Sequence, residues 1–227
     1  MTISVIIPTL NEAPAIEDTL HCLRHPAFSE ILIVDGGSHD ETLARAAGAS
    51  PRARLLSSPK GRARQLNHGA AASTGEVLLF LHADTLLPST AGDDITSALQ
   101  DPHIVGGRFD VRLDRDTGWL WAVSRLMNFR SRMTNIATGD QALFVRKPAF
   151  LAVGGFPDIP IMEDIAFTKQ LKQQGRIASL HSCVITSARR WTRHGPLRTI
   201  LLMWALRLLF FLGVPPARLK QWYPETR

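Results

Sequence analysis

Three strongly apolar runs, of which only the first contains a polar residue (Ser4), constrain the fold of this 227-residue chain more than any other feature. They lie at residues 3–7, 31–34 and 77–81, and helical patterns separate them at 14–23, 40–47 and 62–72. Apolar runs without polar alternation are typical of strands that are buried on both faces. Strands that alternate with helices form parallel sheets. The sequence therefore predicts an α/β fold with a central, mostly parallel sheet flanked by helices.

The pattern changes after Asp84. Residues 108–113 alternate between apolar and polar side chains, as a half-buried strand does. A further strand is predicted at 141–146, and helices are predicted at 118–130 and 165–174. A parallel first half with a mixed second half suits one domain, over residues 1–195, that binds a nucleotide and then a second ligand.

Composition narrows the class of protein. The chain contains 45% hydrophobic and 20% charged residues, as folded domains do. Cys22 and Cys183 are far apart and lack C-x-x-C spacing, which argues against a disulfide framework and a structural zinc site. No basic and apolar leader precedes the first predicted strand, so we expect no cleaved signal peptide and a cytoplasmic location.

Positive charge is concentrated at the C-terminal end of the chain. Residues 176–227 contain nine of the 26 Lys and Arg residues and one of the 20 acids. This distribution favours a polyanionic partner such as a phospholipid surface or a diphosphate, with a solvated, salt-bridged surface as the alternative. Zinc-finger and RNP signatures are missing and apolar residues dominate the tail, so nucleic acid is not an expected partner.

Residues 196–227 are expected to form a basic, apolar helix and tail. The apolar stretch at 199–214 contains one charged residue, Arg207. It is shorter than the roughly 20 residues that a membrane-spanning helix needs. It is apolar on nearly every side, so it is either buried against protein or lies in a membrane interface. The tryptophans and arginines around it favour peripheral contact with the inner face of the cell membrane.

Polar residues directly follow each of the three apolar runs. Ligands of open parallel sheets bind beyond the carboxyl ends of the strands, where these residues would meet. They are Thr9, Asn11 and Glu12 after the first run, Asp35 after the second, and His82 and Asp84 after the third. Asp35 could accept hydrogen bonds from a base or a ribose, and Asp84 with His82 could bind a divalent ion. Each cluster alone could instead cap the helix that follows it.

Two further groups carry charge at predicted helix starts. The loop before residue 65 contains Lys60, Arg62 and Arg64, which favours an anion site, with a solvated basic loop as the alternative. It is not a P-loop, and the chain has no G-x-G-x-x-G, so ATPase and NAD-binding functions lack support. Glu163 and Asp164 either stabilise the first turn of their helix or supply a general base.

As a set, these motifs resemble family 2 glycosyltransferases of the GT-A fold. The resemblance covers roughly residues 1–175. Within the family, the chain is similar to a compact bacterial branch with His-Ala-Asp in place of the D-x-D motif. The motifs that carry it lie at 5–12, 33–40, 61–67, 75–84 and 163–164. The fold that it implies is the GT-A nucleotide-diphospho-sugar transferase fold.

The resemblance implies a role for each motif. The nucleoside of a UDP-sugar donor would be held by Thr9, Asn11, Glu12 and Asp35, with Arg62 and Arg64 near the base or the diphosphate. A divalent metal would be bound by Asp84 and His82, and the imidazole favours Mn²⁺ over Mg²⁺. Asp164, beside Glu163, would be the general base. Asp140 would shape the pocket for the donor sugar and the acceptor.

The C-terminal motif at 187–191 resembles one found in processive polysaccharide synthases. Ser187 breaks its first position, so processive synthesis is not supported. Arg190 and Trp191 would close over the diphosphate, or they would anchor the chain at a membrane interface.

The function implied is inverting, metal-dependent transfer of a sugar from a UDP-sugar to an acceptor that the sequence does not identify, with a lipid-linked acceptor as one candidate. A nucleotidyltransferase that makes a nucleotide sugar is one alternative, although the glycine-rich loop it needs after the first strand is missing. A non-catalytic, membrane-associated adaptor that keeps the fold is the other.

Overall fold

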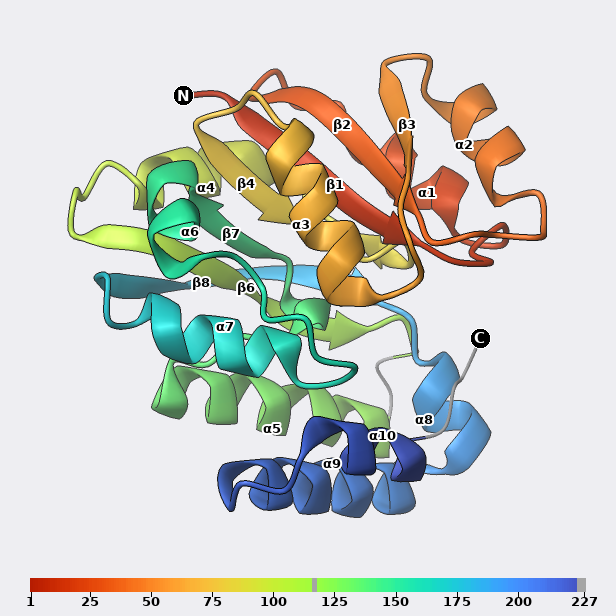
Figure 1. The fold of residues 1–227 in the computed structure, drawn as a ribbon, viewed down its shortest axis with the longest axis vertical. Helices are drawn as coiled ribbons and strands as arrows, with labels where there is room; N and C mark the ends of the chain where they lie inside the picture. The colour runs from red at the N-terminus through yellow and green to blue at the C-terminus, as the bar shows by residue number, and fades with distance from the viewer. Residues whose placement is uncertain (116–117, 224–227) are drawn as a thin grey trace.

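The structure is a computed structural model that describes residues 1–115 and 118–223. Within these residues, eight strands form one sheet in the order β3-β2-β1-β4-β7-β6-β8-β5 (Figure 1). The strands are β1 (Ile3–Thr9), β2 (Phe28–Asp35), β3 (Ala53–Ser57), β4 (Val77–Phe80), β5 (Thr85–Leu86), β6 (Ile104–Leu113), β7 (Leu143–Arg146) and β8 (Arg176–Thr186).

Parallel and antiparallel pairing divide the sheet as the sequence predicts. The first four strands of the chain are parallel to one another. Strand β7 then runs antiparallel to both β4 and β6, while β6 and β8 are parallel. The predicted α/β fold with a parallel first half and a mixed second half is confirmed.

Helices cover both faces of the sheet because alternate strand residues point to opposite sides. The face of Val5 and Ile7 packs against α1 (Ile16–His21), α2 (Thr42–Ala49) and α4 (Ala91–Ala98). The face of Ile6 packs against α3 (Arg62–Ala72), α6 (Lys147–Val153) and α7 (Glu163–Leu171). These two clusters are the core, and they hold the carboxyl ends of β1, β2 and β4 at one edge.

The remaining helices form a separate layer beside β6 and α7, at the bottom of Figure 1. They are α5 (Trp119–Thr134), α8 (Arg189–His194), α9 (Pro196–Phe211) and α10 (Pro216–Trp222). Leu206 of α9 packs on Met162 and Ile165 at the start of α7. Helices α5 and α9 have 16 residues each. Within the described residues, no helix is long and apolar enough to cross a membrane.

Candidate active site

The carboxyl ends of β1 and β2 are joined by the Asp35 carboxylate. Its Oδ1 accepts a hydrogen bond from the Thr9 hydroxyl at 3.2 Å, and its Oδ2 accepts from the amides of Gly37 and Ser38 at 2.9 and 2.8 Å. Burial raises the pKa of Asp35, but these hydrogen bonds and one from the Ser38 hydroxyl outweigh it, so the pKa is lowered. The carboxylate is therefore an ionised acceptor at the strand edge.

The turns after β1 and β2 are tied together next to Asp35. Asn11 has a positive φ of 54°, its amide donates to the Ser38 hydroxyl at 2.9 Å, and its side-chain oxygen accepts from the amide of His39 at 2.9 Å. The Gln65 side-chain amide donates to the carbonyls of Thr9 and Val34, both at 2.8 Å. Gln65, which lies in the 61–67 motif but has no role predicted from the sequence, thus fixes the separation of the two strand ends.

Arg189 links the first and third polar clusters. Its Nη2 lies 2.8 Å from the Glu12 carboxylate and 2.8 Å from the Asp84 carboxylate. Glu12 is buried, with 4% of its side chain exposed, so an opposite charge is needed beside it. The Asp84 and Arg189 backbones are aligned by the adjoining strands, because the hydroxyls of Thr85 and Thr186 are hydrogen-bonded at 2.9 Å.

Arg62 links the third cluster to α7. Its Nη2 lies against both ring nitrogens of His82, at 3.0 Å from Nδ1, and its Nε lies 3.7 Å from the Glu163 carboxylate. Gly139 approaches the same imidazole so closely that a Cβ at this position would lie 2.5 Å from Nε2. A pocket forms here, and its lining includes Arg62, His82, Gly139, Glu163 and Asp164.

Asp164 is held in place by backbone donors. Its Oδ2 accepts from the amide of Gly139 at 2.7 Å, and its Oδ1 accepts from the amide of Ile165 at 2.7 Å. Met162, the residue before α7, has a φ of 68°, a conformation that is strained for a side chain of this size. This turn aims the Asp164 carboxylate into the pocket at the point where the chain enters the helix.

Glu163 differs from Asp164 in its environment. Burial raises the pKa of Glu163 to about 7, the charge of Asp164 acts in the same direction, and Arg62 opposes both. Below a pH of about 4.5, the ordinary pKa of a Glu carboxyl, the group is protonated in folded and unfolded chains alike. Between about 4.5 and 7 the folded chain keeps a proton that the unfolded chain releases, so stability falls as the pH rises.

Replacement of Glu163 by Gln should remove this pH dependence. The melting temperature of the wild type, relative to that of Glu163→Gln, should decrease from about pH 5 to about pH 7 and then level off. Glu41→Gln is the matched control, because the Glu41 side chain is exposed. Parallel pH profiles for the wild type and Glu163→Gln would contradict the assignment.

Not every candidate residue reaches the pocket. The Arg64 Nε is 2.9 Å from the Asp158 carboxylate, and both side chains are exposed. The Asp140 carboxylate accepts the Thr138 hydroxyl at 2.5 Å. Trp191 packs on the α5 cluster around Val123. The side chain of Arg190 lies outside the described residues.

The charged groups of the site include few metal donors. Within the described part of the chain, no group of three or more His, Cys, Asp or Glu side chains is arranged to hold a metal ion. Asp84 offers one carboxylate, of which 22% is exposed. A hard divalent ion bound there would need most of its oxygen ligands from a bound diphosphate and from water.

Comparison with known proteins places the chain among enzymes of sugar transfer. A family model described as glycosyl transferase family 2 matches residues 4–152. Undecaprenyl-phosphate 4-deoxy-4-formamido-L-arabinose transferase of Sodalis glossinidius is 30% identical over 158 residues, which are 63% of this chain and 48% of that protein. The chain spans a third to a half of the length of the curated relatives it matches.

Solved structures share the fold at low sequence identity. Staphylococcus aureus TarS 1-349 in complex with UDP-GlcNAc is 22% identical, with a TM-score of 0.67 over 82% of this chain and 58% of that one. Mycobacterium tuberculosis glucosyl-3-phosphoglycerate synthase in complex with Mn²⁺ and UDP-glucose is 19% identical, with a TM-score of 0.61 over 80% and 70%. Both likenesses confirm the GT-A fold.

Proposed function

The chain belongs to glycosyl transferase family 2, and from this membership and the geometry of the pocket we propose that it transfers a sugar from a UDP-sugar to an acceptor with inversion at the anomeric carbon. One observation carries the proposal. Residues from three strand ends and from α7 are joined by direct contacts: Thr9 with Asp35, Glu12 and Asp84 through Arg189, and Arg62 with His82 and Glu163. These groups are far apart in the sequence, and together they form a polar edge beside the pocket that Asp164 lines.

The transfer would be a single displacement. The acceptor oxygen attacks the anomeric carbon, the bond from this carbon to the diphosphate oxygen breaks, and UDP leaves with the electron pair. The acceptor proton passes to Asp164, whose position at the pocket suits a general base. Arg62, which lies in the same lining, would stabilise the negative charge that grows on the leaving diphosphate.

A divalent ion fits the donor set at Asp84 when a diphosphate supplies further oxygen ligands. The ion would neutralise charge on the diphosphate, and the likeness to an enzyme solved with Mn²⁺ and UDP-glucose supports Mn²⁺ as the candidate. Arg189 holds the Asp84 carboxylate in this structure, so it would have to share or release this group when the ion binds.

Donor binding gives a direct test at Asp84. UDP with Mn²⁺ should raise the melting temperature of the wild type more than UDP alone, because a ligand that binds only the folded state stabilises it. In Asp84→Asn, UDP should still raise the melting temperature, but Mn²⁺ should add no further increase. In the control Asp18→Asn, which alters an exposed residue, both increases should remain. An equal increment in the Asp84 variant would remove this residue from the metal site.

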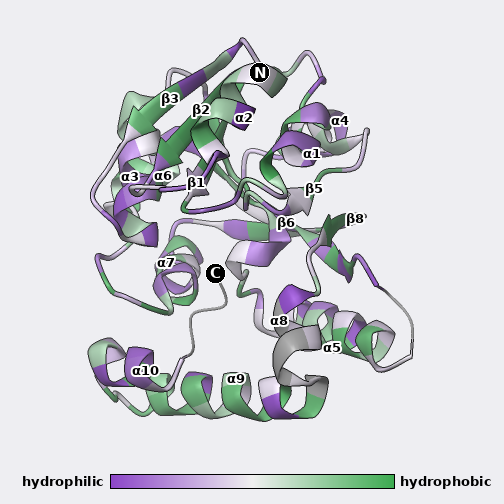
Figure 2. Cartoon of the chain, turned by 90° about the vertical axis from the view of Figure 1, so that its right-hand side faces the viewer, coloured by the Kyte–Doolittle hydropathy of each residue, from purple (hydrophilic) through white to green (hydrophobic). Residues whose placement is uncertain are grey.

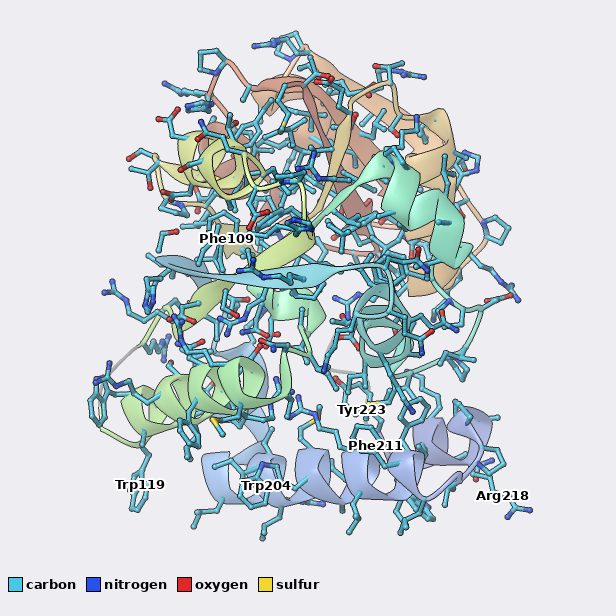
Figure 3. The ribbon with its side chains drawn as sticks, turned by 90° about the vertical axis from the view of Figure 1, so that its left-hand side faces the viewer. Phe109, Trp119, Trp204, Phe211, Arg218 and Tyr223 are labelled. Carbon is cyan, nitrogen blue, oxygen red and sulfur yellow. The ribbon has the colours of Figure 1, made fainter. Side chains whose placement is uncertain are left out.

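Peripheral membrane contact is proposed for the layer formed by α5 and α9. Large apolar side chains are exposed on both helices, and Trp119 projects away from the ribbon (Figure 3). They are Trp119, Trp121, Leu126, Phe129 and Met133 of α5 and Leu197, Leu201, Trp204, Leu208 and Phe211 of α9, named here the α5–α9 face. Figure 2 shows that α9 is hydrophobic along most of its length. Three exposed arginines lie nearby in the chain, Arg125 on α5, Arg198 on α9 and Arg218 on α10. Their positive charge suits an anionic lipid surface.

Loss of apolar side chains from this face should release the protein from lipid. The double change Trp204→Ser and Phe211→Ser should lower the fraction that co-sediments with vesicles of phosphatidylcholine and phosphatidylglycerol, because less apolar area is buried in the interface. The matched control replaces the exposed Leu55 and Leu151, which lie on other parts of the chain, by Ser. It should leave the co-sedimenting fraction unchanged. Equal sedimentation of both variants would exclude this face as the contact.

Product analysis separates the transferase from its alternatives. Incubation with UDP-glucose and Mn²⁺ should release UDP in a reaction that depends on acceptor. A nucleotidyltransferase would instead consume a sugar phosphate and a nucleoside triphosphate and release pyrophosphate. An adaptor would bind vesicles and release no nucleotide product.

A further inference from the structure

Asp84, the carboxylate proposed for the divalent ion, already contacts a cation of the chain itself. The Arg189 Nη2 lies 2.8 Å from the Asp84 Oδ2 and 2.8 Å from the Glu12 Oε2. The two acids follow different strands, because Glu12 comes after β1 and Asp84 lies between β4 and β5, whereas Arg189 begins α8. A divalent ion that binds Asp84 must therefore compete with this guanidinium for the carboxylate.

The contact is built into the fold, because the backbone directly before Arg189 is fixed. The hydroxyl of Thr186, at the end of β8, is hydrogen-bonded to that of Thr85 at 2.9 Å. Ala188 is buried, and its amide donates to the Asp114 carboxylate at 3.0 Å. The Arg189 guanidinium is thus presented from an anchored segment and not from a free loop.

The two ion pairs of Arg189 differ in their exposure to water. The exposed fraction of the side chain is 4% for Glu12, 22% for Asp84 and 44% for Arg189. Removing the partner of a buried charge is strongly unfavourable, whereas an ion pair in contact with water contributes little. The contact with Asp84 is therefore the easier one to break, and the guanidinium can keep Glu12 while it gives up Asp84.

The charges of this group determine which ligand can break the contact. Two carboxylates and one guanidinium carry one net negative charge. A divalent ion alone would reverse this sign and place two cations on the Asp84 carboxylate, where they would repel each other. A diphosphate that binds together with the ion supplies anionic oxygens to both cations, and a guanidinium is well suited to bind such oxygens.

We propose that Arg189 couples the binding of the divalent ion to the binding of the donor diphosphate. In the free protein it competes with the ion for Asp84, and in the donor complex it contacts the diphosphate instead. Arg189 is thus a positioning residue that disfavours the ion when no nucleotide is bound. The inference rests on the proposed transferase function and adds how its two ligands depend on each other. Such coupling is reciprocal, so each ligand raises the affinity for the other by the same factor.

The test measures Mn²⁺ binding to the full chain with and without UDP, by electron paramagnetic resonance of the free ion. Without UDP, Arg189→Gln should bind Mn²⁺ about three- to tenfold more tightly than the wild type, because a site that is available only part of the time binds in proportion to that fraction. UDP should raise the Mn²⁺ affinity of the wild type by a larger factor than that of Arg189→Gln, because in the variant no guanidinium has to leave Asp84.

The matched control is Arg45→Gln. The Arg45 guanidinium also contacts two carboxylates, those of Glu41 at 3.1 Å and Glu17 at 3.7 Å, and 43% of its side chain is exposed. This variant should bind Mn²⁺ within about twofold of the wild type, with or without UDP, since exposed pairs contribute little. Equal Mn²⁺ affinities of the Arg189 and Arg45 variants without UDP would overturn the inference. An equal effect of UDP in the wild type and Arg189→Gln would overturn it as well.

A second variant separates this coupling from a role in stability. Arg189→Gln leaves the Glu12 carboxylate buried without its guanidinium, so the melting temperature without ligand should fall. Glu12→Gln combined with Arg189→Gln removes both charges, so it should recover part of that loss and show the same gain in Mn²⁺ affinity. A lower melting temperature without a gain in Mn²⁺ affinity in either variant would assign Arg189 to the fold alone and overturn the inference.

The outcome for UDP distinguishes this inference from the proposal on which it rests. A wild type that binds UDP, with an Mn²⁺ affinity equal to that of Arg189→Gln, would contradict the coupling and leave the transferase proposal in place. A wild type that does not bind UDP would overturn both.

Discussion

Asp164→Asn should lower the turnover number by about 10²–10⁴-fold, the usual contribution of a general base. The carboxamide keeps the shape of the side chain and one acceptor oxygen for the amide of Gly139 or Ile165, but it cannot take a proton at neutral pH. The affinity for UDP should change little, because the nucleotide would contact the strand ends. Steady-state kinetics and UDP titration on the same preparation measure both quantities.

The control for this change is Asp158→Asn, in which an exposed carboxylate that pairs with Arg64 is altered in the same way. Its turnover number should stay near that of the wild type. A melting temperature measured for both variants shows whether Asp164→Asn keeps the fold. Near-normal turnover in a folded Asp164 variant would remove this residue from the role of base.

Phe167→Ala should cost about 3–5 kcal/mol of unfolding free energy, the range for removing a fully buried aromatic side chain. Phe167 is inaccessible to solvent, and its ring centroid lies 4.4 Å from that of Phe156 and 5.4 Å from that of Phe150. The change leaves a cavity beneath α7, which carries Asp164. For a chain of this length, each kcal/mol corresponds to about 2–4 °C in melting temperature.

The matched change is Leu151→Ala on α6, where the residue is 65% exposed. It should change the unfolding free energy by less than about 0.5 kcal/mol. Chemical denaturation of the two variants compares them directly. A similar small loss for Phe167→Ala would mean that this aromatic cluster does not hold α7 in place.

The fold was predictable where strands are buried on both faces. The runs at 3–7, 31–34 and 77–81 correspond to β1, β2 and β4, because continuous burial leaves a continuous apolar signal. Strand β8 was missed, because most of its residues are only partly buried and its polar residues follow no period of two. The short helices α4 and α6 were missed because so few turns show little periodicity.

The site was predictable where strand ends meet. Thr9 and Asp35 were expected together because parallel neighbours end at the same edge, and the structure joins them by a hydrogen bond. The predicted strand at 141–146 begins instead at Leu143, because Gln141 belongs to the short 3₁₀ helix η1 (Gly139–Gln141) that brings Gly139 to Asp164. That contact depends on tertiary structure, which a local pattern does not report.

The arginines of the site show a different limit. The motif at 187–191 predicts a role for Arg190, whose side chain lies outside the described residues, and the structure adds Arg189, which contacts Glu12 and Asp84. Neighbours on a helix point about 100° apart, so the sequence of this motif does not indicate that Arg189 reaches the site.

The hydroxyl pair of Thr85 and Thr186 has a consequence for the tolerance of the chain to insertions. Asp84 and Arg189 are 105 positions apart, and the two-residue strand β5 sets how they are aligned. One residue added to the end of β8 would displace Arg189 by about 3.3 Å, the rise of a strand, which exceeds its 2.8 Å contact with Asp84. Length changes in the intervening loops should therefore be accommodated, whereas a change of one residue between Thr186 and Arg189 should uncouple the two halves of the chain.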